Sequence, residues 1–503
     1  MLRNESGGKG AARRSLRYLF MPGGGDRLEE RATCRSNRLI LICMALGVLL
    51  YCYFDSRLLT VSAVNFWELI WEGLPRDFYA YQEANPLDFS IYTGGIVALL
   101  PRALWNFPNF ILFHYFHLDY SEIYVCLIWG KLYQLLFFAW ALAEVVRIAE
   151  MLNFREREIR RALYLFFGSI WIYANAFYGG VTESVWIALS LCSFRLLLVE
   201  RRKASLVLAV LSSFAKPFFL PAYLLLLVST ERRWLRLISR SILLVAPLIL
   251  ERLLLVYGFS RYSELMKKSG VQERFLEDLR RFSLSFSGFS ISFLLLITGG
   301  ILLYALLTPR LDVKRDWEIV VFRMSLIYLT YFLLTSSGFY RPMMLFPWVC
   351  LLAAKRGKHY PTIVLVDMVL AVLGPLSFIL RKEPLFDLIA FNRSFLLPNN
   401  PAQLSGKRLA WSFELFDFLG GEGSVSYFVM GTLIALGLLL VFVLLRPCRR
   451  PDGTGPRGVC ALLERFDLHM LSPASPRALR AVLVLRTLTV PLWIGVSLVV
   501  YFA

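Results

Sequence analysis

Charged residues are scarce in this chain. Of its 503 residues, 18% are charged and 57% are hydrophobic. A water-soluble domain has about a quarter of its residues charged, because they cover the surface that faces water. The composition therefore excludes a water-soluble enzyme.

Cysteine is present but is not arranged for metal binding or cross-linking. The eight cysteines include no C-x-x-C pair, and most of them fall in apolar runs or basic loops. Zinc sites and disulfide frameworks show closely spaced cysteine patterns. Neither is expected here.

Acidic residues are in deficit. There are 36 Asp and Glu against 55 Lys and Arg, which gives a net charge of +19. The basic residues cluster in short loops between apolar runs, as is typical of loops that stay in the cytoplasm and face anionic lipid. We therefore expect membrane lipids, and no nucleic acid, as the partner of these charges.

What the sequence does contain is long apolar runs, such as 39–54, 123–143 and 427–445. A helix that crosses a bilayer needs about 20 mostly apolar residues, whereas a membrane β-strand alternates with a period of two. The unbroken runs predict an all-α, polytopic bundle of about 11–13 transmembrane helices.

The basic clusters orient these runs. Residues 1–37 are expected to be a basic cytoplasmic tail, so that the first span near 38–54 leaves the loop 55–121 outside. Within this loop, the stretch 91–113 contains Pro101 and Pro108 and is expected to lie along the outer surface or to re-enter without crossing. The next crossing is predicted at 122–148.

Two later segments complete the predicted topology. Residues 204–229 are expected to form a hairpin of two short helices broken near Lys216-Pro217, because proline ends a helix. Residues 356–503 are expected to add C-terminal transmembrane helices around an outer loop at 382–423.

Acidic and cationic side chains then share the outer face. Asp77 and Asp88 lie among aromatic residues in the first outer loop, and a partly buried carboxylate can act as a general base. Lys216 and Arg341 are placed where a cation can hold a lipid phosphate. Ordinary roles stay open: a loop aspartate often caps a helix, and a cation can anchor at the interface.

Histidine offers one candidate metal site. His114 and His117, with Asp119 nearby, have a spacing that places both imidazoles on one helix face. Such residues are more often interfacial anchors. We therefore predict no metal.

Other charged residues are expected to be structural. Glu251 and Arg252 are expected to neutralise each other, and Asp367 lies in an apolar run with no clear partner. The loop 259–286 alternates acidic and basic residues and is expected to form an amphipathic surface helix.

The order of these features resembles the GT-C superfamily of glycosyltransferases, which use polyprenyl-phosphate-linked sugars. The likeness covers about residues 38–355 and is greatest to bacterial members of unknown acceptor. The motifs that carry it are Asn65-Phe66-Trp67-Glu68, Asp77-Phe78-Tyr79-Ala80-Tyr81, Gly179-Gly180-Val181-Thr182-Glu183-Ser184, Phe214-Ala215-Lys216-Pro217 and Phe339-Tyr340-Arg341-Pro342.

The sequence departs from the commoner family pattern at two places. Glu183 stands where many members have aspartate, and Tyr92-Thr93-Gly94-Gly95 replaces a frequent Tyr-Pro-Pro-Leu. These departures leave the donor and acceptor open, and they keep Asp88 as an alternative base to Asp77.

The resemblance implies that residues 38–355 form a catalytic transmembrane module for inverting, metal-independent transfer of a hexose or pentose. It implies no cofactor, a glycan, lipid or protein acceptor, and a site facing the outside of a bacterial cytoplasmic membrane. The implied residues are Asp77 or Asp88 as the catalytic base, Lys216, Arg341 and Tyr340 at the donor phosphate, and Tyr79, Tyr81 and Glu183 at the substrates.

Two other functions are alternatives. A lipid or solute transporter usually has two related halves, and this sequence shows no such duplication. A surface-polysaccharide polymerase or ligase is expected to centre on a large late loop with basic and histidine residues, and the loop 382–423 has no histidine.

Overall fold

The computed structural model describes most of the chain up to residue 379 and one C-terminal helix. The described residues are 8–22, 27–51, 54–85, 92, 94–118, 123–169, 183–268, 277, 279–280, 283–286, 289–335, 344–357, 359–379, 434–435, 437–438 and 476–502.

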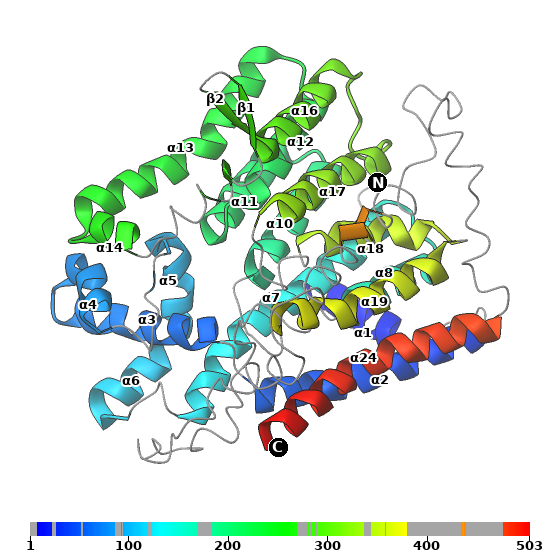
Figure 1. The fold of residues 1–503 in the computed structure, drawn as a ribbon, viewed down its shortest axis with the longest axis horizontal. Coiled ribbons are helices and arrows are strands. Elements are labelled where there is room, and N and C mark those ends of the chain that lie inside the picture. The colour runs from blue at the N-terminus through cyan, green and yellow to red at the C-terminus, as the bar shows by residue number, and fades with distance from the viewer. Residues whose placement is uncertain are drawn as a thin grey trace.

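Within these residues the chain is helical apart from one hairpin (Figure 1), with 18 α-helices and one 3₁₀ turn. The first helices are α1 (Gly8–Phe20), α2 (Arg27–Leu50), α3 (Phe54–Trp71), η1 (Pro75–Asp77), α4 (Phe78–Ala84), α5 (Ile96–Trp105), α6 (Phe107–Phe116), α7 (Tyr124–Met151) and α8 (Glu156–Phe167). The later ones are α10 (Glu183–Leu198), α11 (Arg202–Ala215), α12 (Phe219–Thr230), α13 (Trp234–Gly258), α14 (Tyr262–Lys268), α16 (Phe293–Leu307), α17 (Trp317–Leu334), α18 (Phe346–Lys355), α19 (Tyr360–Ile379) and α24 (Pro476–Phe502).

Several helices have the length and composition of membrane spans. In the described residues, five are long and apolar enough to cross a bilayer, and the bent pair α5–α6 would make six. Four shorter apolar helices accompany them. This is the architecture of a multi-pass helical membrane protein. The predicted loop 382–423 and most of the predicted span at 424–445 lie outside the described residues.

Helices α2 and α7 run in opposite directions and define two faces of the bundle. The Lys131 ammonium of α7 donates to the last carbonyls of α2, at 3.1 Å from Gly47 and 3.2 Å from Val48, and also to Tyr51. At the other end of α7, Arg14 of α1 pairs with Glu150 at 2.9 Å. Residues 52–123 therefore emerge and return on the face where α2 ends, which we call the lobe face. The opposite face is the basic face.

Ion pairs join helix ends on the basic face. Lys355 at the end of α18 lies 2.7 Å from Glu158 at the start of α8. Glu231, which follows α12, is buried and contacts Arg202 of α11 at 3.3 Å and Arg240 of α13 at 3.0 Å. These contacts bring together segments that the sequence predicts to lie in the cytoplasm.

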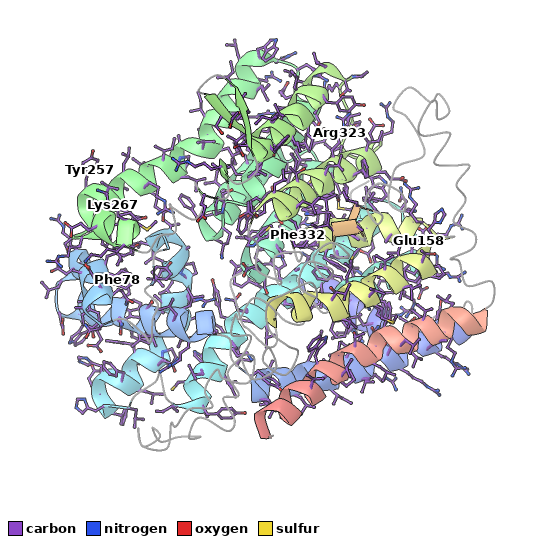
Figure 2. All side chains as sticks on the ribbon, in the orientation of Figure 1. Phe78, Glu158, Tyr257, Lys267, Arg323 and Phe332 are labelled. Carbon is purple, nitrogen blue, oxygen red and sulfur yellow. The ribbon has the colours of Figure 1, made fainter. Side chains whose placement is uncertain are left out.

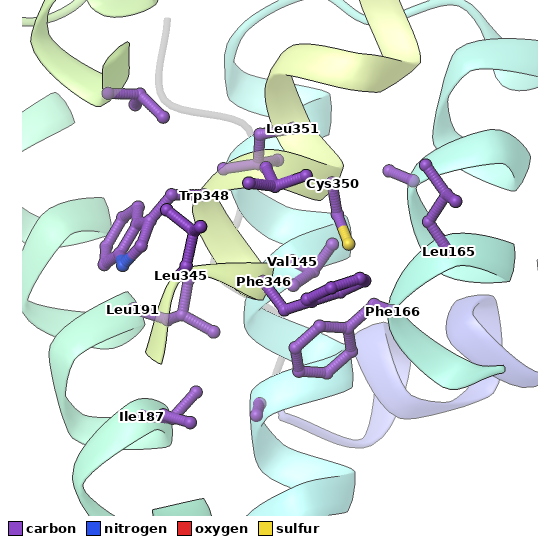
Figure 3. Close-up of a cluster of buried hydrophobic side chains, with 14 of the residues drawn as sticks. Val145, Leu165, Phe166, Ile187, Leu191, Leu345, Phe346, Trp348, Cys350 and Leu351 are labelled. Carbon is purple, nitrogen blue, oxygen red and sulfur yellow. The ribbon is translucent and has the colours of Figure 1, made fainter. Parts of the chain in front are cut away.

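The apolar core lies where α7, α8, α10 and α18 meet (Figure 3). Phe166 of α8 stacks on Phe138 of α7, with centroids 5.8 Å apart. Trp348 of α18 is fully buried and meets Phe194 of α10 edge to face at 5.5 Å. The short helix α18 thus fills the centre of the bundle rather than crossing it.

Part of the expected tail 1–37 is packed: α1 buries Ala11, Ser15 and Leu19, and the second helix begins at Arg27. One expectation needs correction. The loop 259–286 is not one surface helix: α14 is short, and strand β1 (Ser283–Phe286) pairs antiparallel with β2 (Phe289–Ser292). The all-α class is confirmed, and this hairpin is the one pair of strands among the described residues.

Asp367 has a partner that the sequence did not suggest. Its carboxylate accepts a hydrogen bond from Arg486 of α24 at 2.5 Å, and both side chains are buried. Arg486 also donates to the carbonyls of Tyr164 and Leu165 at 3.0 Å. The pair therefore ties α19, α24 and α8 together, and Asp367 has a structural role.

We predict that Asp367→Asn strongly destabilises the protein, because it leaves Arg486 buried without its counter-charge. The loss is on the order of 3 kcal/mol. The measurement is the thermal unfolding midpoint of the purified full chain in detergent. The double variant Asp367→Asn/Arg486→Gln should recover part of this loss of stability. If its loss equalled the sum of the losses of the two single variants, the pairing would be contradicted.

Candidate functional site

The first loop folds into a helical lobe on the lobe face. Helices α3, α4 and α5 pack with the end of α13 and with α14 around a buried cluster that includes Phe66, Phe78, Tyr92 and Tyr262. Figure 2 shows Phe78, Tyr257 and Lys267 at the lobe end of the molecule and Glu158 at the opposite end. The predicted first outer loop is therefore a packed unit.

Asp77 lies where η1 meets α4. Gly73 adopts φ +76°, which lets the chain turn out of α3, and Asp77 follows as the N-cap position of α4. Its side chain makes no capping bond. Instead the carboxylate accepts a hydrogen bond from the Ser260 hydroxyl at 2.6 Å, while the Ser260 backbone N–H donates to Arg76 O at 3.0 Å. Asp77 thus joins the first loop to the segment after α13.

A second contact closes the same junction. Glu83 of α4 pairs with Lys268 of α14 and lies 3.7 Å from Arg261. The Lys268 hydrogen bond holds the pKa of the Glu83 carboxyl below its ordinary value of 4.5. The two contacts form a clasp between α4 and the α13–α14 segment.

The two tyrosines of the Asp77 motif have different environments. Tyr79 is fully buried, its hydroxyl donates to Gly94 O at 2.6 Å, and burial raises its pKa well above the ordinary value. Tyr81 is exposed, and its pKa is raised by partial burial and by the nearby Glu72 and Glu68 carboxylates. Tyr79 therefore supports the fold of the lobe, and Tyr81 alone of the two faces outward.

Glu251 and Arg252 have different hydrogen-bond partners, because adjacent residues on a helix point in different directions. Glu251 accepts a hydrogen bond from the Val97 backbone N–H at 3.0 Å, at the start of α5. A Cβ on Gly95 would lie 2.3 Å from the Glu251 carboxylate, so glycine allows this approach. Arg252 contacts the Tyr262 hydroxyl.

The predicted surface stretch 91–113 is a bent pair of helices. Helices α5 and α6 meet at 68°, with the break at Asn106, directly before Phe107-Pro108. In α6, His114 pairs with Glu68 at 3.2 Å. No cluster of three metal-ligating side chains occurs among the described residues. Asp119 lies outside them.

The second group of predicted residues lies inside the bundle. Helix α11 ends at Ala215 and α12 begins at Phe219, so the expected break at Lys216-Pro217 is confirmed. The Lys216 ammonium lies 3.3 Å from the carboxylate of Glu183, the first residue of α10, and 5.9 Å from the Phe218 ring centre. Glu183 is 1% exposed and Lys216 is 33% exposed.

This ion pair is recessed from the lobe face. Helix α11 has 14 residues and α13 has 25, so they rise about 21 Å and 37 Å at 1.5 Å per residue. Both begin near Glu231 on the basic face. Helix α11 therefore ends well short of the end of α13, and Lys216, which follows α11, is recessed from the lobe face.

Several polar atoms around the pair are buried without a hydrogen-bond partner. Both Glu183 carboxylate oxygens, the Ser184 hydroxyl and the Trp186 indole N–H, all in the first turn of α10, are in this state. Such groups cost free energy unless water or a ligand satisfies them. The site offers acceptors, donors and one reachable cation to a polar ligand.

The predicted site residues thus form two groups in the described structure. Asp77 lies in the lobe with Ser260, and Lys216 lies with Glu183 at the helix break; Figure 1 shows α4 and α10 well separated in the view. Asp88, Tyr340 and Arg341 are outside the described residues. The convergence of Asp77, Lys216 and Arg341 in one cleft therefore stays a prediction.

Sequence reasoning missed Ser260, Ser184 and Trp186. Ser184 and Trp186 directly follow Glu183 and share the first turn of its helix, so the quoted motif already contained the signal for Ser184. Ser260 is separated from Asp77 by 183 residues, and no local pattern marks it.

Comparison with known proteins adds no assignment. No family model, curated protein or solved structure matches the chain.

We predict that Glu83→Gln loosens the clasp. The amide loses the ion pairs with Lys268 and Arg261, so amide hydrogen exchange in α14 should become several-fold faster at pH 7. In the wild type, the lowered pKa of Glu83 stabilises the clasp fully above pH 4.5. This stabilisation is lost as the pH falls through the pKa of Glu83 in the folded state, so acid should speed exchange in α14 as the variant does. Glu72→Gln, an exposed carboxylate of the same lobe, is the control. Equal exchange in Glu83→Gln and Glu72→Gln would contradict the clasp.

Proposed function

We propose that this protein is an integral membrane glycosyltransferase that moves a sugar from a polyprenyl-phosphate donor to an acceptor on the lobe face. The observation that carries the proposal is the recessed Glu183–Lys216 pair, with unsatisfied polar atoms around it, on the same side of the bundle as the carboxylate-bearing lobe. The resemblance to the GT-C superfamily supports the same reaction class.

Lys216 is suited to the donor phosphate. Its ammonium is a cation with three N–H donors, and it lies 3.3 Å from the Glu183 carboxylate. The exposed third of the side chain leaves it reachable from the break between α11 and α12. As the sugar leaves, the phosphate gains charge, and a fixed cation in an apolar surrounding stabilises that charge.

Asp77 supplies the base in this proposal. Its carboxylate takes the proton of the acceptor hydroxyl or amide while the acceptor atom attacks C1 of the sugar. The bond from C1 to the acceptor forms as the bond from C1 to the phosphate oxygen breaks. The polyprenyl phosphate departs with that electron pair, and the configuration at C1 inverts. The hydrogen bond from Ser260 orients the carboxylate before the acceptor binds.

We predict that Asp77→Asn lowers sugar transfer by about 10²-fold or more, because a general base contributes roughly 10²–10⁴ to the rate. The assay follows transfer from a panel of undecaprenyl-phosphate hexoses and pentoses in membranes that contain the full chain. Glu72→Gln is the matched control and should keep full transfer. Unchanged transfer in Asp77→Asn, with loss in Asp88→Asn, would move the base to Asp88.

A lipid or solute transporter is the second candidate. The break between α11 and α12, with the buried Glu183 carboxylate beside it, favours it, because discontinuous helices hold the binding sites of many transporters. The same panel separates the two functions. A transferase releases undecaprenyl phosphate and a transporter leaves the donor intact.

A further inference from the structure

One face of α2 changes character along the helix. Exposed positions recur every three or four residues, which places them on one side of the helix. They are Arg31, Arg35 and Arg38, followed by Ile42, Leu46 and Leu49. A helix with this profile passes from the headgroup layer into the hydrocarbon of a bilayer.

Helix α24 repeats the pattern beside α2. The two helices run side by side in Figure 1, and the Tyr51 hydroxyl at the end of α2 donates to Ile494 O near the end of α24 at 3.4 Å, so they are parallel. Arg480 is exposed and is followed by exposed Val484, Leu488 and Leu492. Arg480 precedes Ile494 by 14 residues, as Asn37 precedes Tyr51. Because the two helices are parallel, Arg480 is level with Asn37, next to Arg38.

These arginines keep their donors for a ligand. In the described part of the chain, Arg31, Arg35 and Arg480 have no hydrogen bond or ion pair, and Arg38 donates to Phe20 O at 3.3 Å. Their acidic neighbour Glu30 is buried and faces the other way, into a small cavity that it lines with Arg157 and Arg160. Among the described side chains at this end of α2, the exposed charges are therefore all cationic.

We propose that the basic-face end of α2 and α24 is a binding site for an anionic phospholipid. The planar guanidinium groups of Arg31, Arg35, Arg38 and Arg480 match a phosphate group, which they can engage through two N–H donors each. The apolar stripes directly above them, on both helices, accept the acyl chains of the same molecule. The site lies on the face opposite the lobe and does not depend on the proposed function.

The test is the affinity of the purified full chain for phosphatidylglycerol in detergent, measured by titration against phosphatidylcholine and inorganic phosphate. Binding should be strong only for phosphatidylglycerol. Each arginine near an anionic lipid contributes about fivefold, so Arg31→Gln/Arg35→Gln should weaken the affinity about 25-fold.

The control removes the same charge elsewhere. Arg76→Gln/Lys267→Gln neutralises two exposed cations of the lobe and should leave the affinity unchanged. If both double variants lost the same affinity for phosphatidylglycerol, the binding would depend only on net charge, and the proposed site would be overturned. Inorganic phosphate binding as tightly as phosphatidylglycerol would overturn the lipid, and equal binding of phosphatidylcholine would overturn the role of the arginines.

Discussion

A charge inside an apolar layer needs a partner, and this requirement organises the bundle. Three buried charges in the described core bond to helices distant in sequence. Lys131 of α7 holds the end of α2, Glu144 of α7 accepts from Arg195 of α10 at 2.5 Å, and Asp367 of α19 bonds to Arg486 of α24. Because removing one partner leaves an uncompensated charge, each pair fixes which helices are neighbours.

The same requirement separates structural charges from functional ones. Glu144 accepts hydrogen bonds from Arg147, Arg195 and Trp140 and is fully engaged. Glu183 is just as buried, yet its carboxylate has only the 3.3 Å ion pair with Lys216 and no hydrogen bond. A buried carboxylate left in this state points to a ligand that completes it.

Sequence patterns predicted the parts of this fold that depend on local rules. Apolar runs predicted the spans α2 and α7, and proline predicted the break at Lys216. Patterns failed where distant segments decide the outcome. The partner of Asp367 comes from α24, and the basic N-terminal segment is helical because α7 and α8 offer it a surface on which to bury Leu19. The bond between Asp77 and Ser260 is of the same kind, since it depends on where α13 ends.

The central claim is that the lobe carrying Asp77 and the basic helix ends lie on opposite faces of a membrane. Single cysteines at the exposed positions Ser263 of the lobe and Arg13 of α1 test this most directly, with a membrane-impermeant thiol reagent on intact cells. The five described native cysteines are buried and give a low background. The account predicts labelling at Ser263→Cys from outside and at Arg13→Cys only after the cells are opened. Labelling of both from one side, or the reverse order, would contradict it.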